Sequence, residues 1–342
     1  MFKFNKLYWE LNLKGYACIP FLLLFTLNLS AQDFHTIDFD STSTFFKNET
    51  TYSKGVENTV IQVISDIEQL IDPKYDNQIR IKVTTIEKKI QALAYIVPKY
   101  ENILLFRNGI TTGRVWQKYN TTNINPNDLT YDCELFINTY YEYNTLEGEF
   151  DNNKYDLYSI ILHEYIHSLG FFSMINKNGE SIETNYEQGI FSLFDTRLQA
   201  DGNQLISFNA ANLVTFNSEL KPMLKDECAI SYLLDLPIVF SPSDWQNGSS
   251  ISHLDTNCLD KKFAMMPSVY KGQIKRTPLY EDLYVLSTLG YYITGKFRGD
   301  TILTEQQISD LSSYYIPITN NDFIDTISVN GNNILKSHFF TY

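Results

Sequence analysis

The chain has 342 residues, enough for one large domain or two modest ones, and its 44% hydrophobic and 20% charged residues are typical of a globular protein. Its formal net charge is −13, and no lysine- or arginine-rich run opposes this acidity. Nucleic acid is therefore excluded as an expected partner, because an acidic surface is repelled by a phosphate backbone.

The first 31 residues are typical of an export signal. Positive charge precedes a short apolar run at residues 19–27, and it comes from Lys3, Lys6 and Lys14. The run is too short and too interrupted to span a bilayer, and the small residue Ala31 follows it at a suitable cleavage position. We therefore predict a signal peptide over residues 1–31, a secreted, periplasmic or cell-surface location, and no membrane span once the signal is removed.

The next segments predict one helix followed by several strands. Residues 32–58 are polar and without clear period, so we expect a loosely ordered entry segment. Apolar residues at helical spacing then predict a first helix over residues 60–71. Alternating or β-branched runs predict strands over residues 79–85, 92–97, 102–106 and 132–138.

The segment His163-Glu164-Tyr165-Ile166-His167 carries the strongest chemical signal in the chain. On a helix, side chains at positions i and i+4 lie on the same face, so both imidazoles can reach one metal ion. Glu164, beside the first histidine, can contact a water on that ion without binding the ion itself. Two ligands, one general base and an open position for water are typical of a zinc hydrolase.

The residues around this motif predict a capped, half-buried helix. Apolar residues upstream recur at helical spacing, at positions 157, 160, 161 and 162. Gly170 stands where a helix ends on a left-handed residue. Good N-cap residues precede the apolar run, namely Asp151, Asn152 and Asn153.

Downstream of the motif the chain is rich in Asn, Ser, Gly and Pro. Residues 190–200 could form one helix there, and residues 281–289 predict a last helix that ends at Gly290. A strand is possible at residues 323–329. Three cysteines remain after the leader, so at most one disulfide forms; we favour Cys228–Cys258 and leave the other pairings with Cys133 open.

A catalytic zinc ion binds three protein ligands and a water, so the two motif histidines need a third partner. Ser173 stands where a histidine would complete a short zinc motif, and serine is a poor zinc ligand. Glu187, 20 residues after His167, has the spacing of a glutamate ligand on a following helix, but the Asn- and Gly-rich residues 176–179 predict an early turn. His253 is the third candidate.

The surroundings of His253 suit a ligand. Residues 248–250 are Gly-Ser-Ser and permit a sharp turn into a site. Asp255 follows closely and could hold the other nitrogen of the imidazole. A Met-Met-Pro turn lies at residues 265–267, twelve residues after His253. These features favour His253 over Glu187, which stays open as the alternative ligand.

Four segments together resemble the leishmanolysin-like metzincins, in their secreted bacterial form. They are His163-Glu164-x-x-His167-x-Leu169-Gly170-Phe171, Ser252-His253-Leu254-Asp255, Met265-Met266-Pro267 and Leu286-x-x-Leu289-Gly290-Tyr291. The resemblance spans roughly residues 77–293. In that family an inserted segment separates the third histidine from the helix, and a methionine turn underlies the metal.

The resemblance implies an α+β, zincin- or metzincin-like fold, with a mixed twisted sheet and the active-site helix in an N-terminal subdomain and a loop-rich C-terminal subdomain. It implies one catalytic Zn²⁺, with Glu164 as general base, Met265 as the turn methionine and Met266 as its rival. The implied metal ligands are His163, His167 and His253. The expected organisation is a signal peptide (1–31), an N-terminal or pro-like segment (32–76), a metallopeptidase catalytic domain (77–295) and a C-terminal tail (296–342).

The activity implied is that of a zinc endopeptidase acting on protein or peptide substrates. Glu164 would take a proton from the attacking water and pass it to the leaving amine. Tyr270, just past the methionine turn, is a candidate to support the oxyanion. We expect the strand at residues 132–138 to form the sheet edge along which substrate lies extended. Oxygen-rich residues 151–153 and 321–325 leave room for a Ca²⁺ ion.

Three other functions stay open from the sequence. One is a gluzincin-type peptidase that uses Glu187 as its third ligand. Another is a surface-binding protein that retains a zinc site without activity, although the intact Glu164 weighs against it because an inactive site does not need that carboxylate. The third is a zinc hydrolase that acts on small amides.

Overall fold

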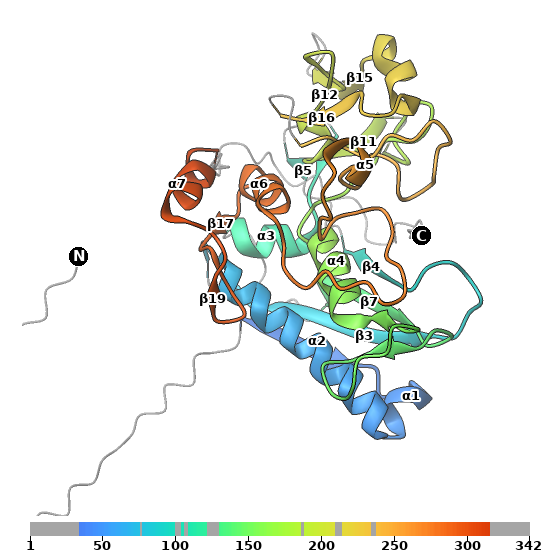
Figure 1. The fold of residues 1–342 in the computed structure, drawn as a ribbon. Coiled ribbons are helices and arrows are strands. Elements are labelled where there is room, and N and C mark those ends of the chain that lie inside the picture. Colours follow the sequence, from blue (N-terminus) through green and yellow to red (C-terminus); the bar gives the residue numbers. More distant parts are fainter. Residues whose placement is uncertain are drawn as a thin grey trace, which may run out of the picture. The chain divides into compact units, whose positions relative to one another are not determined.

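A four-stranded sheet of order β1-β3-β7-β4 supports the first half of the chain in this computed structural model (Figure 1). Its strands are β1 (His35–Phe39), β3 (Ile79–Ile86), β4 (Ala94–Pro98) and β7 (Cys133–Asn138). β1, β3 and β7 are parallel to one another, whereas β4 runs antiparallel along β7 at the edge. The structure describes residues 34–314 apart from residues 76, 100–103, 106–108, 122–129, 186–187, 209–213 and 234–236.

The sheet follows from the alternation seen in the sequence. In β3 the apolar residues Ile79, Ile81 and Val83 are fully buried, and the polar residues between them are half-exposed. The strands predicted at residues 79–85, 92–97 and 132–138 are confirmed with small shifts at their ends. Of the strand predicted at residues 102–106, the described part is β5 (Leu104–Leu105).

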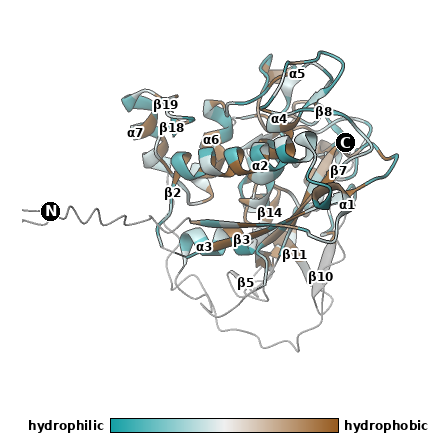
Figure 2. Cartoon of the chain, turned by 90° about the horizontal axis from the view of Figure 1, so that it is seen from below, coloured by the Kyte–Doolittle hydropathy of each residue, from teal (hydrophilic) through white to brown (hydrophobic). Residues whose placement is uncertain are grey.

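Two helices, α2 (Thr51–Leu70) and α4 (Leu157–Ser168), pack against each other, and α4 also packs against β4 (Figure 1). Thr50 caps α2 by accepting from the backbone N–H of Ser53. Teal and brown residues both occur along α2 in Figure 2, in keeping with an amphipathic helix whose apolar side is buried in the core. The first predicted helix is thus confirmed, although it begins at Thr51 and not near residue 60.

The segment over residues 32–76 supplies structural parts of the core. β1 pairs with β3 in the central sheet, and α2 supplies buried Val60, Val63 and Ile67. The expectation that residues 32–58 are loosely ordered is therefore wrong for β1, for α1 (Thr44–Lys47) and for the first turns of α2. Whether any of this segment is removed during maturation stays a prediction.

Short strands and turns make up much of the second half. These elements are β8 (Tyr143–Asn144), β9 (Tyr155–Asp156), β10 (Glu183–Asn185), β11 (Gln188–Ser192), η1 (Asp195–Arg197), β12 (Leu198–Ala200), β13 (Asn203–Gln204), β14 (Ile206–Phe208), β15 (Val214–Phe216), η2 (Ser218–Lys225), β16 (Ile230–Tyr232) and α5 (Thr256–Leu259). The helix predicted over residues 190–200 is wrong, because β11, η1 and β12 occupy that stretch.

Some of the last described elements contact elements from the first half of the chain. α6 (Tyr280–Thr288) ends before Gly290, as predicted, and packs against α7 (Glu305–Tyr314). β17 (Tyr292–Ile293) pairs with β2 (Ile71–Asp72), and β18 (Lys296–Phe297) lies beside α2 and pairs with β19 (Asp300–Thr301). The remaining elements are β6 (Ile110–Thr111), which pairs with β11, and α3 (Arg114–Asn120). The described residues thus form a mixed α+β fold.

Several expectations fall on other parts of the chain. The signal peptide, the possible strand at residues 323–329 and the oxygen-rich residues 321–325 lie outside the described residues. Among the helices that are described, none is long and apolar enough to cross a membrane.

Candidate metal centre

Helix α4 carries the His-Glu-x-x-His motif, and specific residues define both of its ends. Asp156 is the N-cap: its carboxylate accepts from the backbone N–H of Ser159 at 3.1 Å and forms an ion pair with Arg276. The predicted caps at residues 151–153 are wrong, because β9 continues the chain in extended form to Asp156. Gly170 ends the helix at φ +102°, a backbone conformation that residues other than glycine rarely adopt. Its predicted role as the residue that ends the helix is confirmed.

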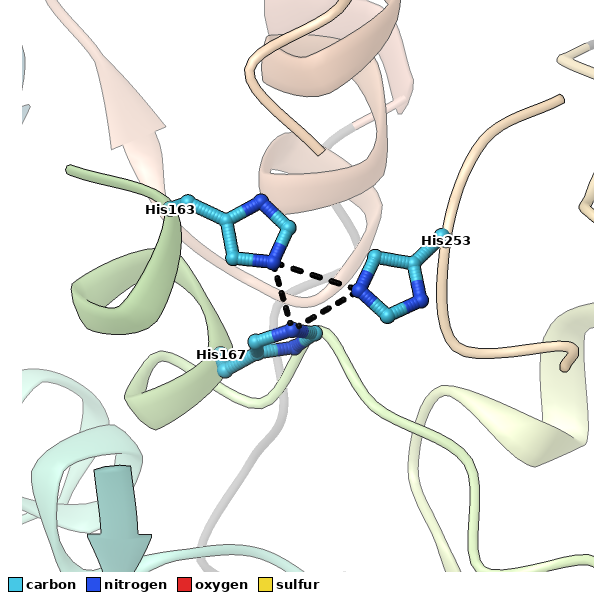
Figure 3. A group of neighbouring side chains, drawn as sticks. All are labelled: His163, His167 and His253. Atoms are coloured by element: carbon cyan, nitrogen blue, oxygen red, sulfur yellow. Dashed lines mark hydrogen bonds between the residues drawn. The ribbon is translucent and has the colours of Figure 1, made fainter. Parts of the chain in front are cut away.

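The three candidate histidines meet at one point, as Figure 3 shows. The Nε2 atoms of His163 and His167 are 3.1 Å apart, and each lies 3.2 Å from Nε2 of His253. All three side chains are buried, and together they form a group that could hold a metal ion. Nitrogens bound at about 2.0–2.1 Å to one tetrahedral zinc ion lie about 3.3 Å apart, so the spacing fits such an ion.

Each imidazole is oriented by its other nitrogen, which donates to a backbone carbonyl oxygen. The Nδ1–H groups donate from His163 to Ala264 at 2.8 Å, from His167 to Phe171 at 2.6 Å and from His253 to Ser249 at 2.8 Å. A carbonyl oxygen can only accept, so each Nδ1 carries a proton. In a neutral ring, Nε2 is then left with a lone pair that faces the other two rings.

The protonation state of the group favours a cation. Burial lowers the pKa of His163 to about 4 and that of His253 to about 3, and it lowers the pKa of His167 well below its ordinary value. The rings are therefore neutral at pH 7, and their three Nε2 atoms, which act as acceptors in this tautomer, lie 3.1–3.2 Å apart. This arrangement is repulsive by itself, and a cation bound by all three nitrogens would stabilise it.

His253 reaches α4 on a tightly turned segment. Gly248 and Ile251 both have positive φ, +80° and +55°, and the turn brings the Ser249 carbonyl under the imidazole. A disulfide between Cys228 and Cys258 closes a 30-residue loop that contains this segment, as predicted. Closing a loop of that length contributes about 3–4 kcal/mol in the chain-entropy view.

Asp255 was predicted to hold the imidazole of His253, and this is wrong. Its carboxylate instead caps α5 by accepting from the backbone N–H groups of Asn257 and Cys258, at 2.8 and 2.9 Å. The backbone carbonyl of Ser249, and not the Asp255 carboxylate, accepts from Nδ1–H of His253. The third cysteine, Cys133, is a buried free thiol in β7.

The methionine turn is held by a buried carboxylate that the sequence did not single out. Asp282, on α6, accepts from the backbone N–H groups of Ala264 and Met265 at 3.0 and 3.1 Å. The Ala264 carbonyl accepts from His163, and the Met265 carbonyl accepts from the N–H of Leu254, next to His253. This turn therefore contacts both chain segments that bear histidines.

Glu164 has an environment that suits a base beside a cation. It is fully buried, and burial raises the pKa of its carboxyl well above the ordinary value, with the backbone N–H of Ile96 offsetting part of the shift. That N–H lies close to the carboxylate but lacks the geometry of a hydrogen bond, and neither carboxylate oxygen has a hydrogen-bond partner among the described residues. A buried carboxylate left in this state costs several kcal/mol unless a positive charge compensates it, so Glu164 fits a site that holds a divalent cation.

The other predicted residues are placed less centrally. Ser173 donates its hydroxyl to Asp195 at 2.5 Å. Glu187 lies outside the described residues, but its flanking segments are the strands β10 and β11 and not the helix that a glutamate ligand of that kind would need. Asp151 belongs to no group of three close metal-ligating side chains in the described part of the chain, and a calcium site stays a prediction.

A cavity of about 680 Å³ lies next to the methionine turn. Its lining includes Met266, Pro267 and Tyr270, and the Tyr270 side chain is 68% exposed. Met265, in contrast, is fully buried in the core. The two adjacent methionines are thereby distinguished: the first is internal, and the second faces space that a ligand could enter.

The predicted sheet edge is wrong. β7, at residues 133–138, is hydrogen-bonded on both sides, to β3 and to β4. Among the described strands the outermost on that side is β4, which packs against α4, and its residue Ile96 approaches Glu164. A polypeptide that adds to this sheet beside the histidines would therefore pair with β4.

Comparisons of the chain with protein-family models, with curated proteins and with solved structures find no match. The function must therefore be inferred from the geometry of the site itself.

The buried histidines predict how the metal-free protein responds to acid. The pKa of His253 is about 3 when folded and near 6.5 when unfolded, so its neutral form stabilises the fold above pH 6.5 and this contribution is lost as the pH falls towards 3. Between pH 8 and pH 5 the free energy of unfolding of the metal-free wild type should fall by about 2 kcal/mol relative to His253→Asn. Urea denaturation of both proteins at the two pH values measures this; a difference that does not change with pH would contradict the burial of a neutral ring.

Proposed function

We propose that this protein is a zinc-dependent endopeptidase of metzincin type, exported from the cell, in which His163, His167 and His253 bind the metal and Glu164 is the general base. The observation that carries the proposal is the convergence of three Nε2 atoms, each on a ring that a backbone carbonyl orients. The unpaired carboxylate of Glu164 on the same helix supports it. Met265 is proposed as the turn methionine, because it is internal and its backbone joins the histidine-bearing segments.

A zinc ion bound by the three imidazoles would lower the pKa of a water towards about 7 and polarise a substrate carbonyl. Glu164 accepts the proton of the attacking water, because no hydrogen bond from the described residues occupies its carboxylate oxygens. The same group then delivers that proton to the leaving amine. The raised pKa of Glu164 favours the protonated state that this second transfer requires.

The substrate proposed is a protein or peptide in extended form. Among the described strands β4 is the outermost of its sheet and it packs against α4, so we propose that the backbone of a substrate lies along β4 in extended form. The cavity beside Met266 and Tyr270 can take a side chain of that substrate. Tyr270 is proposed as a residue that contacts substrate, because its exposed ring lines this cavity.

Cleavage of an unstructured protein tests the proposed function directly. We expect the purified mature chain to hydrolyse casein, a zinc chelator to stop the reaction, and added Zn²⁺ to restore it. A zinc-loaded chain that leaves casein intact would contradict the proposal and favour a surface-binding protein or an amide hydrolase. Cleavage that resists the chelator would contradict the role of the metal.

A further inference from the structure

A second buried carboxylate, that of Asp195 at the start of η1, organises the loop that follows helix α4. It is fully buried and accepts three hydrogen bonds: from the Ser173 hydroxyl at 2.5 Å, from the Met174 N–H at 2.9 Å and from the Ser192 N–H at 2.8 Å. The Ser192 hydroxyl in turn donates to the carbonyl of Phe172 at 2.7 Å. One carboxylate thus fixes residues 172–174 from the side of β11 and η1.

The same loop contacts two of the three histidines or their neighbours. The carbonyl of Phe171 accepts from Nδ1–H of His167 at 2.6 Å. The backbone N–H of Ser173 donates to the hydroxyl of Ser252, next to His253, at 3.0 Å. Residues 171–174 therefore lie between the end of α4 and the segment that carries the distant histidine.

Aromatic packing holds η1 against this loop. The rings of Phe171 and Phe194 stack with centroids 5.0 Å apart, and Phe194 stacks in turn on Tyr232 of β16 at 5.0 Å. The residue before Asp195 and the residue that orients His167 are thus in direct contact. A shift of η1 would move the Phe171 carbonyl and, with it, the imidazole of His167.

We propose that Asp195 is a positioning residue, which holds residues 171–174 in the arrangement that directs Nε2 of His167 and of His253 to one metal ion. Ser252 is the second part of this connection, since its hydroxyl joins the loop to the His253 segment. The inference depends on the metal site proposed above but not on peptide hydrolysis, so metal binding alone can test it.

The test uses Asp195→Ala, Asp195→Asn and a matched control, Asp66→Ala. Asp66 is also a fully buried carboxylate, but it accepts from Tyr158 and Gln62 and has no hydrogen bond to a histidine or its carbonyl partner. The readouts are the zinc dissociation constant, by competition with a chelator, the visible spectrum of the cobalt-substituted protein and the melting temperature.

We expect Asp195→Ala to weaken zinc binding by about 10–100-fold and to change the cobalt spectrum. Asp195→Asn should restore most of the affinity, because the amide oxygen can accept from the two N–H groups and the Ser173 hydroxyl can reverse its direction. Asp66→Ala should lower the melting temperature and leave zinc affinity unchanged.

A folded Asp195→Ala protein with wild-type zinc affinity and spectrum would overturn the proposal. If that variant does not fold, Ser252→Ala tests the same connection, and unchanged affinity and spectrum there would overturn it equally. A wild-type chain that binds no zinc would instead refute the proposed function. The two failures are therefore distinguishable.

Discussion

We expect Glu164→Gln to bind zinc as the wild type does and to lower kcat for casein hydrolysis by about 10²–10⁴-fold. Glutamine has nearly the same shape, but its amide cannot accept the proton of the attacking water at neutral pH. The imidazoles keep their backbone partners in this variant, so the metal ligands are unaffected. The measurement is kcat together with zinc content per chain.

Glu219→Gln provides the matched control, because Glu219 is an exposed glutamate on η2. It should retain both activity and zinc. If Glu164→Gln hydrolyses casein at the wild-type rate, Glu164 is not the general base. If it loses zinc as well as activity, Glu164 contributes to metal binding and the proposed division of roles fails.

The second large effect is expected at His253. His253→Asn should weaken zinc binding by more than about 10²-fold, because loss of a residue that merely orients a ligand already costs 10–100-fold and this change removes the ligand. Activity at a fixed low zinc concentration should be lost with the metal. Zinc content after dialysis against a weak chelator measures the effect.

Two further variants separate the alternatives. Glu187→Gln should keep its zinc if His253 is the third ligand, and it should lose its zinc if the protein is a gluzincin-type peptidase. His35→Gln changes another buried histidine, whose ring is bonded to Glu68 and Tyr165 and not to the group of three. It should retain zinc, so a loss of metal there would mean that His253→Asn acts through general destabilisation.

Local chemistry explains why the motif helix could be predicted. The period of its apolar residues, the paired histidines and the left-handed Gly170 are all written within one stretch of sequence. The disulfide could also be predicted from the sequence, because the three cysteines after residue 31 allow only three pairings. The start of the helix was predicted too early, at residues 151–153. Asp156, which caps it, belongs to β9, and the pairing of β9 with β8 cannot be predicted from so short a strand.

Features that depend on tertiary contacts were beyond the sequence. Residues 190–200 have apolar spacing that a helix can use, yet pairing of β11 with β6 and of β12 with β16 favours strands. The partner of His253 is a main-chain carbonyl, which any residue could supply, so no side-chain pattern pointed to Ser249. Asp195 and Asp282 each accept from a backbone N–H far away in sequence, that of Met174 and that of Met265, so no local pattern could predict these contacts.

The edge of the sheet shows the same limit. The sequences of β4 and β7 both predict strands. Their order in the sheet depends on which strands they pair with, and neither sequence specifies these partners. The polar start of α2 was not predicted as helix, because what stabilises it is the Thr50 cap and contacts with the segment 143–145, where the Tyr143 N–H donates to the Tyr52 hydroxyl and Gly55 lies against Thr145.

Anomalous diffraction from crystals of the mature chain, recorded on both sides of the zinc absorption edge, tests the metal site most directly. The account predicts a single zinc peak about 2.0–2.1 Å from Nε2 of His163, His167 and His253, with Glu164 making no bond to it. A pocket without metal, or a zinc ion held by Glu187 while His253 points elsewhere, would contradict it.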